Sequence, residues 1–298
     1  MQRPSRRLGV TLNVAALVLL MVPVRAAQMS FARGDIFVSL ETTGAVHWYL
    51  PDGTLRGVLA STVLGWGEGM AFDAAGNLYL AHWRADSAGL TGNTVEKFNN
   101  LGQSMGAVGN GYDCDPHTVE FDSTGIGYVG QAGCRRSLLK FVPGELVPRE
   151  LFPAEEFQGL FWMDLASDDC TLFYTSLGPN VKRFDVCANA QLPDFNVTAL
   201  PGAFTHDLRE LPGGGLLVAN QDVIVRLDRA GSIAQTYAGP PGEPTLWAGL
   251  DIVGDGTFWA ANYYTSDVYR IDLASGSLVD SFNTGTPPNT AVDVIVMP

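Results

Sequence analysis

Residues 68–81 of the 298-residue chain read EGMAFDAAGNLYLA, and this stretch predicts a β-hairpin. The first arm covers residues 70–72 and the second covers 78–80. Asp73 opens the turn between the arms, and Gly76 supplies the left-handed residue that closes it. Variants of this unit recur along the rest of the chain, so the hairpin is the element from which the fold can be predicted.

The hairpins recur with a regular period. Each second arm is an apolar triplet, such as 78–80 or 216–218, and a third strand follows in which a basic residue precedes a large apolar one. The basic positions are spaced by 43, 43, 43 and 44 residues: Lys97, Lys140, Arg183, Arg226 and Arg270. A glycine turn and a weaker fourth strand complete the unit. Four antiparallel strands in about 40–45 residues are typical of a propeller blade, whereas a sandwich has about seven to nine strands without such a repeat.

The two ends of the chain are expected to complete one blade together. The first unit, which starts at Gly34, lacks an innermost strand, and residues 290–295 match the innermost strands at 68–73 and 117–122. Pairing the last strand into the first blade would remove the exposed edge of the ring. The sequence therefore predicts an all-β fold in which residues 27–298 form a single six-bladed β-propeller.

The first 26 residues have the features of a secretory signal peptide. Three arginines precede a largely apolar run over 8–24, and small residues flank a cleavage site after Ala26. A retained membrane anchor is the alternative, but Asn13 and Pro23 interrupt the run, and a membrane span needs about 20 apolar residues. We expect a secreted or periplasmic protein whose mature chain has no membrane span.

The charge of the chain limits its partners. The chain has 18 basic and 31 acidic residues, and removal of residues 1–26 leaves a net charge of −17. Such a chain lacks the basic surface that nucleic acids and anionic membranes require. The expected partner is a small-molecule or carbohydrate ligand, or another exported protein.

Four cysteines remain after the signal peptide, and their positions predict two disulfides. Cys114 and Cys134 lie symmetrically about the centre of the hairpin 117–131, and Cys170 and Cys187 lie symmetrically about the next second-to-third-strand turn. Each pair would face across its own hairpin. A zinc site is the alternative, but the sequence has no CxxC spacing. Asp113 and Asp115, beside the first of these cysteines, are expected to be turn residues.

Six equivalent residues begin the innermost strands and should surround one mouth of the central channel: Glu68, His117, Trp162, His206, Ala248 and Thr290. Glu68, His117 and His206 form a ligand set that suits one divalent metal ion as cofactor. The same residues could supply a general base, with His117, His206 and Glu68 as candidate catalytic groups. A polar, water-filled mouth without an ion is the third alternative.

The repeats resemble those of six-bladed propellers of the NHL and gluconolactonase-like group, which includes the senescence marker protein family. Residues 78–81 with 95–98 look like the NHL pattern of an apolar strand followed by a valine and a basic–aromatic pair. Residues 68–72 resemble the opening of the gluconolactonase-like family, in which the glutamate is a metal ligand. That family has Asn and Asp at later ring positions, where this chain has His117, Trp162 and His206. The resemblance therefore implies a metal ligand only at Glu68.

The mouth of the channel is also expected to be rich in aromatic side chains. The candidate ligand-binding residues lie at the starts of inner strands or in loops after second strands: Trp83, Trp162, Tyr263, Tyr264, Asn262 and Asn220. Aromatic rings beside polar groups in a concave site suit a sugar or another small organic ligand. Packing between blades is the alternative role for the tryptophans and tyrosines.

Two functions are compatible with these features. The first is an exported binding or interaction module that uses the aromatic face. The second is a metal-dependent lactonase, esterase or lyase with Glu68, His117 and His206 at the channel mouth, where a metal would activate a carbonyl or a bound water. Because propellers serve many functions, the fold does not choose between them.

Overall fold

The structure is a computed structural model that describes residues 29–83 and 92–298. The predicted signal peptide lies outside the described residues. Within those two ranges, no helix is long and apolar enough to cross a membrane.

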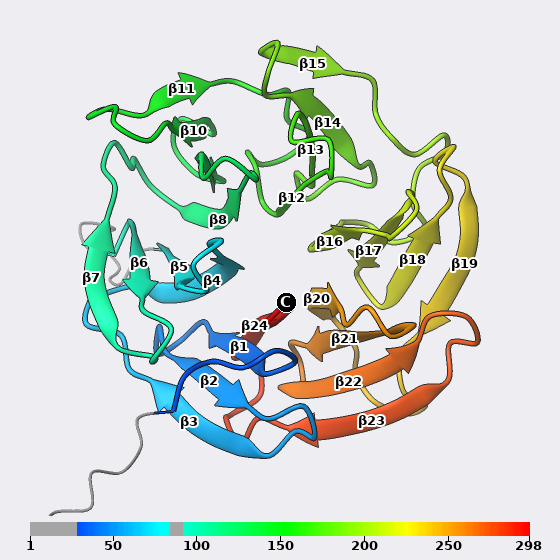
Figure 1. The fold of residues 1–298 in the computed structure, drawn as a ribbon. Helices are drawn as coiled ribbons and strands as arrows, with labels where there is room; N and C mark the ends of the chain where they lie inside the picture. The colour runs from blue at the N-terminus through cyan, green and yellow to red at the C-terminus, as the bar shows by residue number, and fades with distance from the viewer. Residues whose placement is uncertain (1–28, 84–91) are drawn as a thin grey trace, which may run out of the picture.

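The described chain is all-β and forms six four-stranded antiparallel sheets (Figure 1). We number these blades 1 to 6 in chain order. Each of blades 2 to 6 uses four consecutive strands. The strands are β1 Ile36–Leu40, β2 Val46–Tyr49, β3 Leu55–Leu59, β4 Trp66–Phe72, β5 Leu78–Trp83, β6 Thr94–Phe98, β7 Ser104–Val108, β8 Pro116–Phe121, β9 Gly127–Gln131, β10 Leu138–Phe141, β11 Arg149–Leu151, β12 Met163–Leu165, β13 Thr171–Tyr174, β14 Lys182–Asp185, β15 Ala190–Leu192, β16 Leu208–Glu210, β17 Leu216–Asn220, β18 Val223–Leu227, β19 Ile233–Ala238, β20 Trp247–Ile252, β21 Thr257–Asn262, β22 Asp267–Asp272, β23 Leu278–Asn283 and β24 Ala291–Val296.

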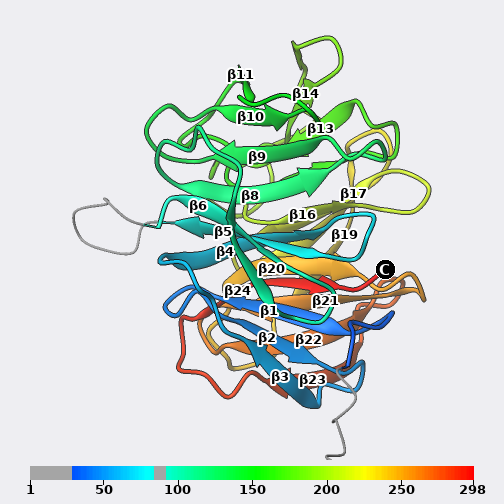
Figure 2. The same ribbon diagram turned by 60° about the vertical axis from the view of Figure 1, so that its left-hand side comes forward.

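The ring closes as the sequence predicts. β24 pairs antiparallel with β1, with Ile36 opposite Val296, and so completes blade 1 from the other end of the chain. The six inner strands contact one another in a closed cycle: β24, β4, β8, β12, β16 and β20. The C-terminus lies near the centre of the ring (Figure 1), and Figure 2 shows the sheets from the side.

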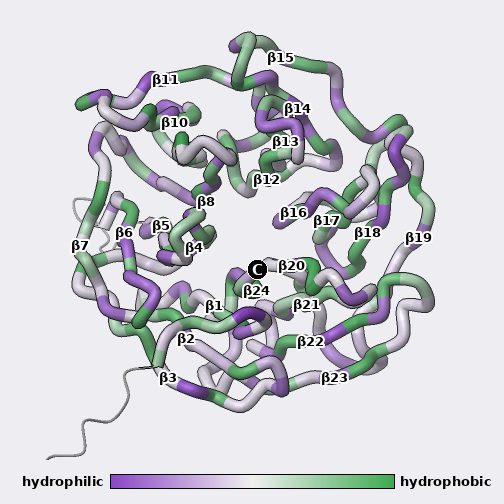
Figure 3. The backbone as a smooth tube through the Cα atoms, viewed as in Figure 1, coloured by the Kyte–Doolittle hydropathy of each residue, from purple (hydrophilic) through white to green (hydrophobic). Residues whose placement is uncertain are grey.

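The core is divided among the interfaces between blades. Six clusters of buried apolar side chains each combine residues from two adjacent blades. Alternate residues of a central strand point to opposite neighbours: Leu217 packs toward blade 6, while Leu216 and Val218 pack toward blade 4. Hydrophobic residues are accordingly spread around the whole ring (Figure 3).

The repeated basic residue has a structural explanation. Lys97 lies opposite Tyr79 in the neighbouring strand, and its Nζ is 4.9 Å from the centroid of that ring. Arg270 has the same relation to Trp259, at 5.7 Å. Such cation–π contacts keep the charged group at the surface while its stem covers apolar area.

The hairpin at residues 68–81 forms with the predicted turn. The N–H of Gly76 donates to the carbonyl of Asp73 at 2.8 Å, and Gly76 has a φ of 74°. Both arms are longer than expected, since β4 starts at Trp66 and β5 ends at Trp83.

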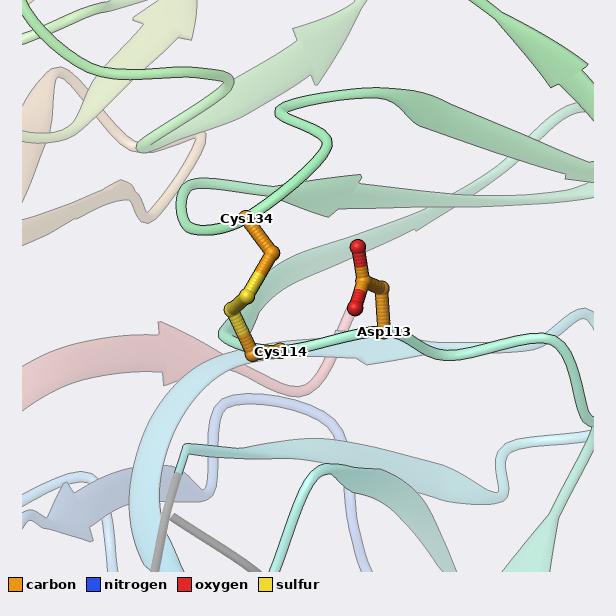
Figure 4. A group of neighbouring side chains, drawn as sticks. All are labelled: Asp113, Cys114 and Cys134. Carbon is orange, nitrogen blue, oxygen red and sulfur yellow. A yellow bond between two sulfur atoms is a disulfide. The ribbon is translucent and has the colours of Figure 1, made fainter.

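Both predicted disulfides are present. Cys114 and Cys134 have a Cα–Cα distance of 5.6 Å, and Cys170 and Cys187 one of 5.2 Å. Figure 4 shows the first bond with Asp113 beside it. Each bond closes a loop within one blade, so neither links one blade to the next.

A series of aspartates links the inner strands of successive blades. Each carboxylate accepts a hydrogen bond from a backbone N–H of the next blade. The pairs are Asp164 with Glu210, Asp207 with Leu250 at 2.8 Å, Asp251 with Val296 at 2.7 Å, and Asp293 with Met70 at 2.8 Å. We call these four residues the aspartate relay. They satisfy backbone donors that would otherwise be buried without partners.

Candidate functional site: a pocket at the channel mouth

A cavity of about 300 Å³ opens at one mouth of the channel, and we call it the mouth pocket. Its lining comprises Glu41, Glu68, Trp83, Asp115, His117, Gln158, Phe161, Trp162, Leu177, His206, Leu246, Ala248, Tyr263 and Val292. Five of the six predicted ring residues are among them. The sixth, Thr290, is buried nearby and donates a hydrogen bond to the carbonyl of Pro287 at 2.7 Å, and Val292 lines the pocket for blade 1 instead.

Local irregularities of the inner strands place three of these residues. The pairing of β4 with β5 shifts between Gly67 and Met70, so Glu68 lies in a bulge. The same kind of shift occurs at His117 in β8 and around Ala248 in β20. A bulge turns a side chain away from the regular alternation of a strand and is common next to functional sites.

Glycine makes one of these bulges possible. Gly249 follows Ala248, and a Cβ at this position would lie 2.5 Å from the Cα of Asp293 in the adjacent inner strand. No side chain fits at that distance. The close approach of blades 6 and 1 therefore requires glycine here.

The side chain of His117 is oriented by a hydrogen bond with Asp115. Its Nδ1 lies 2.9 Å from Oδ1 of Asp115. A carboxylate can only accept, so this contact places a proton on Nδ1, and in the neutral imidazole Nε2 then carries the lone pair. The Nε2 atom lies 3.7 Å from Oε2 of Glu68, which is too long for a hydrogen bond. Asp115, expected to be a turn residue, instead orients His117.

His206 occupies the opposite part of the wall, and its environment is apolar. Its ring lies 5.5 Å from Phe161 and 5.3 Å from Phe204, measured between ring centroids. Burial, reinforced by the nearby His117, lowers the pKa of His206 to about 3. The imidazole is therefore neutral at physiological pH.

Three polar atoms of the pocket are buried without a hydrogen-bond partner among the described residues. They are Nε2 of His117, Nδ1 of His206 and Nε1 of Trp162. A buried polar group without a partner costs about 1–3 kcal/mol. Three such atoms around one cavity indicate that the pocket is built for polar contacts that the chain itself does not make.

The acidic groups of the pocket lie close together. Burial is the main cause that raises the pKa of Glu68 well above its ordinary value, and the charges of Glu41, Asp115 and Asp293 add to it. Glu41 accepts a hydrogen bond from the hydroxyl of Tyr263 at 2.5 Å. A positive charge placed beside Glu68 would oppose both effects.

The predicted metal ligands line one cavity but do not converge on one point. Glu68 and His117 approach to 3.7 Å. Among the described residues, the groups of at least three potential ligands with all ligand atoms within 4.8 Å of one another do not include this pair with His206. The groups that meet this distance contain Cys114 with Cys134 or Cys170 with Cys187, whose sulfurs are held in disulfides. A shared ion, with bonds near ~2.0–2.2 Å, would require His206 to move inward.

The candidate ligand-binding residues fall into two groups. Trp83, Trp162 and Tyr263 line the mouth pocket, whereas Tyr264 lies beside Tyr263 with its ring tilted by 53° and 43% of its surface exposed. The asparagines do not line the pocket and are fully buried.

The side chains of both asparagines form hydrogen bonds with backbone groups instead. Asn220 accepts from the N–H of Gly202 at 2.6 Å and donates to the carbonyl of Phe204 at 2.9 Å. Asn262 accepts from the N–H of Leu246 at 3.1 Å. These contacts fix the loops that lead into the inner strands of blades 5 and 6.

A second cavity, of about 400 Å³, is lined by later residues of the inner strands and by the C-terminal residues of the chain. It is lined by Glu120, Asp164, Arg209 and Asp251 among others. Arg209 is buried and forms ion pairs with Asp207, with Asp251 at 3.5 Å and with Asp293 at 3.9 Å. Burial raises the pKa of Asp164 and of Asp293 to about 6, although Arg209 opposes the shift.

The periodic alignment of the inner strands contains a signal for this cluster of charged residues in the second cavity. Glu120, Arg209, Asp251 and Asp293 each follow a ring residue by three positions. The aromatic Phe161 directly precedes the ring residue Trp162, and the acid Glu41 follows β1 as Tyr263 follows β21, but neither position has a recurring residue type that marks it in the sequence.

The similarities to known proteins support the fold. No family model and no curated protein matches the sequence. A chain from the crystal structure of a nidogen/laminin complex superposes with a TM-score of 0.69 and 12% identity, covering 89% of this chain and 98% of that one. A streptogramin B lyase gives 0.57 and 13%, covering 87% and 76%. The virginiamycin B lyase from Staphylococcus aureus gives 0.56 and 11%, covering 87% and 88%. At these identities the likeness concerns the fold alone.

Proposed function

We propose that this protein is an exported binding module that holds a small organic ligand in the mouth pocket. The observation that carries the proposal is the set of three unpartnered polar atoms, on His117, His206 and Trp162, around one cavity. Aromatic rings supply the walls, with Phe161 stacked on His117 at 4.0 Å between centroids. Apolar walls with a few convergent polar groups are typical of small-ligand sites.

The disulfides and the predicted signal peptide are consistent with export of the protein. Two disulfides suit an oxidising compartment, and the predicted signal peptide would deliver the chain there. A protein partner is an alternative occupant, because one structural relative comes from a nidogen/laminin complex. The enclosed volume of about 300 Å³ favours a small molecule or a single sugar unit.

A thermal-shift screen tests the proposal. A library of sugars, amines, alcohols, lactones and carboxylic acids is added to the full mature chain. We expect at least one class to raise the Tm, because a ligand that binds only the folded state stabilises it. The shift should disappear in Ala248→Trp, which fills the pocket, and in Trp162→Phe, which removes the unpartnered N–H but keeps an aromatic ring.

The exposed Tyr264 provides the matched control. Tyr264→Ala changes an aromatic residue next to the pocket without altering its lining, so the ligand-induced shift should persist. Ligand shifts of equal size in Ala248→Trp and in the unmodified chain would contradict binding in the mouth pocket.

A metal-dependent lactonase, esterase or lyase is the second candidate function. The observation that favours it is the orientation of His117, whose Nε2 carries a lone pair at the pocket while Asp115 holds Nδ1. Such a pair can take a proton from a substrate or a water. Glu68, His117 and His206 would hold a divalent ion, which would polarise a carbonyl.

Metal content separates the two functions. Gently purified protein is analysed by mass spectrometry for divalent ions, and hydrolysis of γ-butyrolactone and p-nitrophenyl acetate is measured. The enzyme hypothesis predicts one ion per chain and a loss of both ion and activity in His206→Ala. Activity lost with the metal retained would make His206 a proton-transfer group. Metal-free, inactive protein that still binds a ligand supports the binding module.

A further inference from the structure

The mouth pocket has a one-sided set of charges. Glu41, Glu68 and Asp115 contribute carboxyl groups, and none of the described residues that line the pocket is a lysine or an arginine. Among the described lining residues, the other ionisable groups with nitrogen are His117 and His206. The described lining residues thus do not supply a lysine or arginine as the positive partner of these carboxyl groups.

Two atoms that can accept hydrogen bonds face one another across a short gap, and a bound ammonium group would favour the ionised form of Glu68. In the neutral imidazole, Nε2 of His117 has a lone pair because Asp115 holds the proton on Nδ1. Oε2 of Glu68 lies 3.7 Å away. A donor on a ligand could contact both atoms from one position, and an ammonium group has several N–H donors.

The walls beside these acceptors are aromatic. Phe161 stacks on His117 with an interplanar angle of 25°, and Trp162 meets the same imidazole edge-on at 4.6 Å. Trp83 and Tyr263 line the pocket as well. The faces of such rings attract organic cations, and the attraction increases when water is excluded.

We propose that the ligand of the mouth pocket is a small organic cation, an amine whose ammonium group lies between Glu68 and His117. This inference rests on the proposed binding function and names its ligand class. The aromatic side chains contact the carbon skeleton of the amine. Nε1 of Trp162, which can only donate, binds an oxygen of the same ligand when one is present.

The geometry favours an amine over a metal ion at this point. A metal needs several ligand atoms at about 2 Å, and only the pair formed by Glu68 and His117 approaches that arrangement. An ammonium group needs hydrogen-bond acceptors near ~2.8 Å and tolerates aromatic neighbours.

The experiment compares cations with uncharged molecules of the same shape. The probes are benzylamine with benzyl alcohol, and cyclohexylmethylamine with cyclohexylmethanol. Calorimetric titration of the full mature chain at pH 7 gives each Kd. We expect each cation to bind at least about tenfold more tightly than its neutral counterpart, which corresponds to one charged contact.

Glu68→Gln tests the assigned contact because it preserves shape and cannot ionise, whereas a bound ammonium group would favour the carboxylate form of Glu68 over the protonated form that burial favours. It should weaken benzylamine binding by about tenfold and leave benzyl alcohol binding within about twofold. The matched control is Asp222→Asn, the same change at an exposed carboxylate in the loop between β17 and β18. It should leave both affinities unchanged. Circular dichroism and Tm verify that each variant is folded.

Three outcomes would overturn the inference. Equal affinities within both pairs would show a pocket without preference for cations. A loss of benzylamine binding in Asp222→Asn equal to that in Glu68→Gln would indicate a nonspecific response to net charge. Binding of Zn²⁺ or Ca²⁺ through Glu68, without selectivity for amines, would make the site a metal site. In each case neutral ligands of the broader library can still protect the protein, so the binding function stands or fails separately.

Discussion

The carboxylate of Asp293 accepts a hydrogen bond from the backbone N–H of Met70 at 2.8 Å, across 223 positions of sequence. The contact joins the last strand of the chain to the first complete blade. It belongs to the aspartate relay, in which an inner strand binds the backbone of the next. The ring is thus closed twice, by the pairing of β24 with β1 and by side chains inside the channel.

Deletion of residues 288–298 should sharply lower the Tm or prevent folding. The deletion removes β24, exposes the edge of β1 and leaves the N–H of Met70 without its acceptor. Thermal unfolding followed by circular dichroism measures the effect. Deletion of Pro298 alone is the control, since it leaves β24 intact. An unchanged Tm in the longer truncation would mean that the ring does not depend on its last strand.

Arg209→Met should destabilise the protein by about 3–5 kcal/mol at pH 7, because it leaves several buried carboxyl groups without their only adjacent cation among the described residues. Arg270→Met is the control, in which a partly exposed arginine loses a surface ion pair with Asp255, and it should cost about 1 kcal/mol. Urea unfolding gives both values. Similar losses in the two variants would argue against a special role for Arg209.

Protonation of Asp164 and Asp293 should favour the folded state as the pH falls from 7 to 5, whereas His206, whose pKa burial lowers to about 3, opposes this gain because it stays neutral while the unfolded chain is protonated. The pKa of Asp164 and of Asp293 is raised to about 6 by burial, so the folded protein binds protons that the unfolded chain releases above about pH 4. Stability contributed by such groups is greatest below about pH 4 and decreases as the pH rises through 6. The two aspartates alone would contribute a gain of roughly 5 °C at pH 5 for a chain of this size, before the opposing effect of His206.

Asp164→Asn serves as the control for this pH dependence. The amide keeps an oxygen for the N–H of Glu210 and cannot ionise, so the difference in Tm between pH 7 and pH 5 should shrink. Turn carboxylates whose pKa is lowered, such as Asp73 and Asp122, lose stabilising contacts only at still lower pH. The same difference in Tm between pH 7 and pH 5 in Asp164→Asn and in the unmodified chain, at equal ionic strength, would contradict the prediction.

Removal of the second disulfide by Cys170→Ser together with Cys187→Ser should reduce stability by about 2–4 kcal/mol, since the bond closes a short loop that the unfolded chain would otherwise leave free. Non-reducing peptide mapping of the unmodified protein should give peptides linked 114–134 and 170–187. A peptide linked 134–170 would refute this pairing.

The blade architecture could be predicted because its causes are local and periodic. The spacing from Lys97 to Arg270 reflects one basic residue per third strand, stacked on an aromatic ring in most blades. Closure was visible because residues 290–295 resemble the other inner strands. The cysteine pairing followed from the symmetry of each hairpin.

The detailed site could not be predicted because it depends on contacts between blades. The bulge at Glu68 and the role of Gly249 arise from the close approach of adjacent inner strands. Asn220 and Asn262 had the right residue type and region for ligand contacts, but their amides are used by neighbouring backbone. Asp115 resembled a turn residue until the structure placed it beside His117.

The position of β24 in blade 1 also sets the order of events during synthesis. Ribosomes add roughly 5–20 residues per second, so about 13–51 s separate the first strand from the last. Blades 2 to 6 can assemble from neighbouring segments as they emerge, but β1 must wait for β24. During that interval the nascent chain is an open arc with one unpaired edge. A chaperone, or the wrong strand of a second nascent chain, would bind at that unpaired edge.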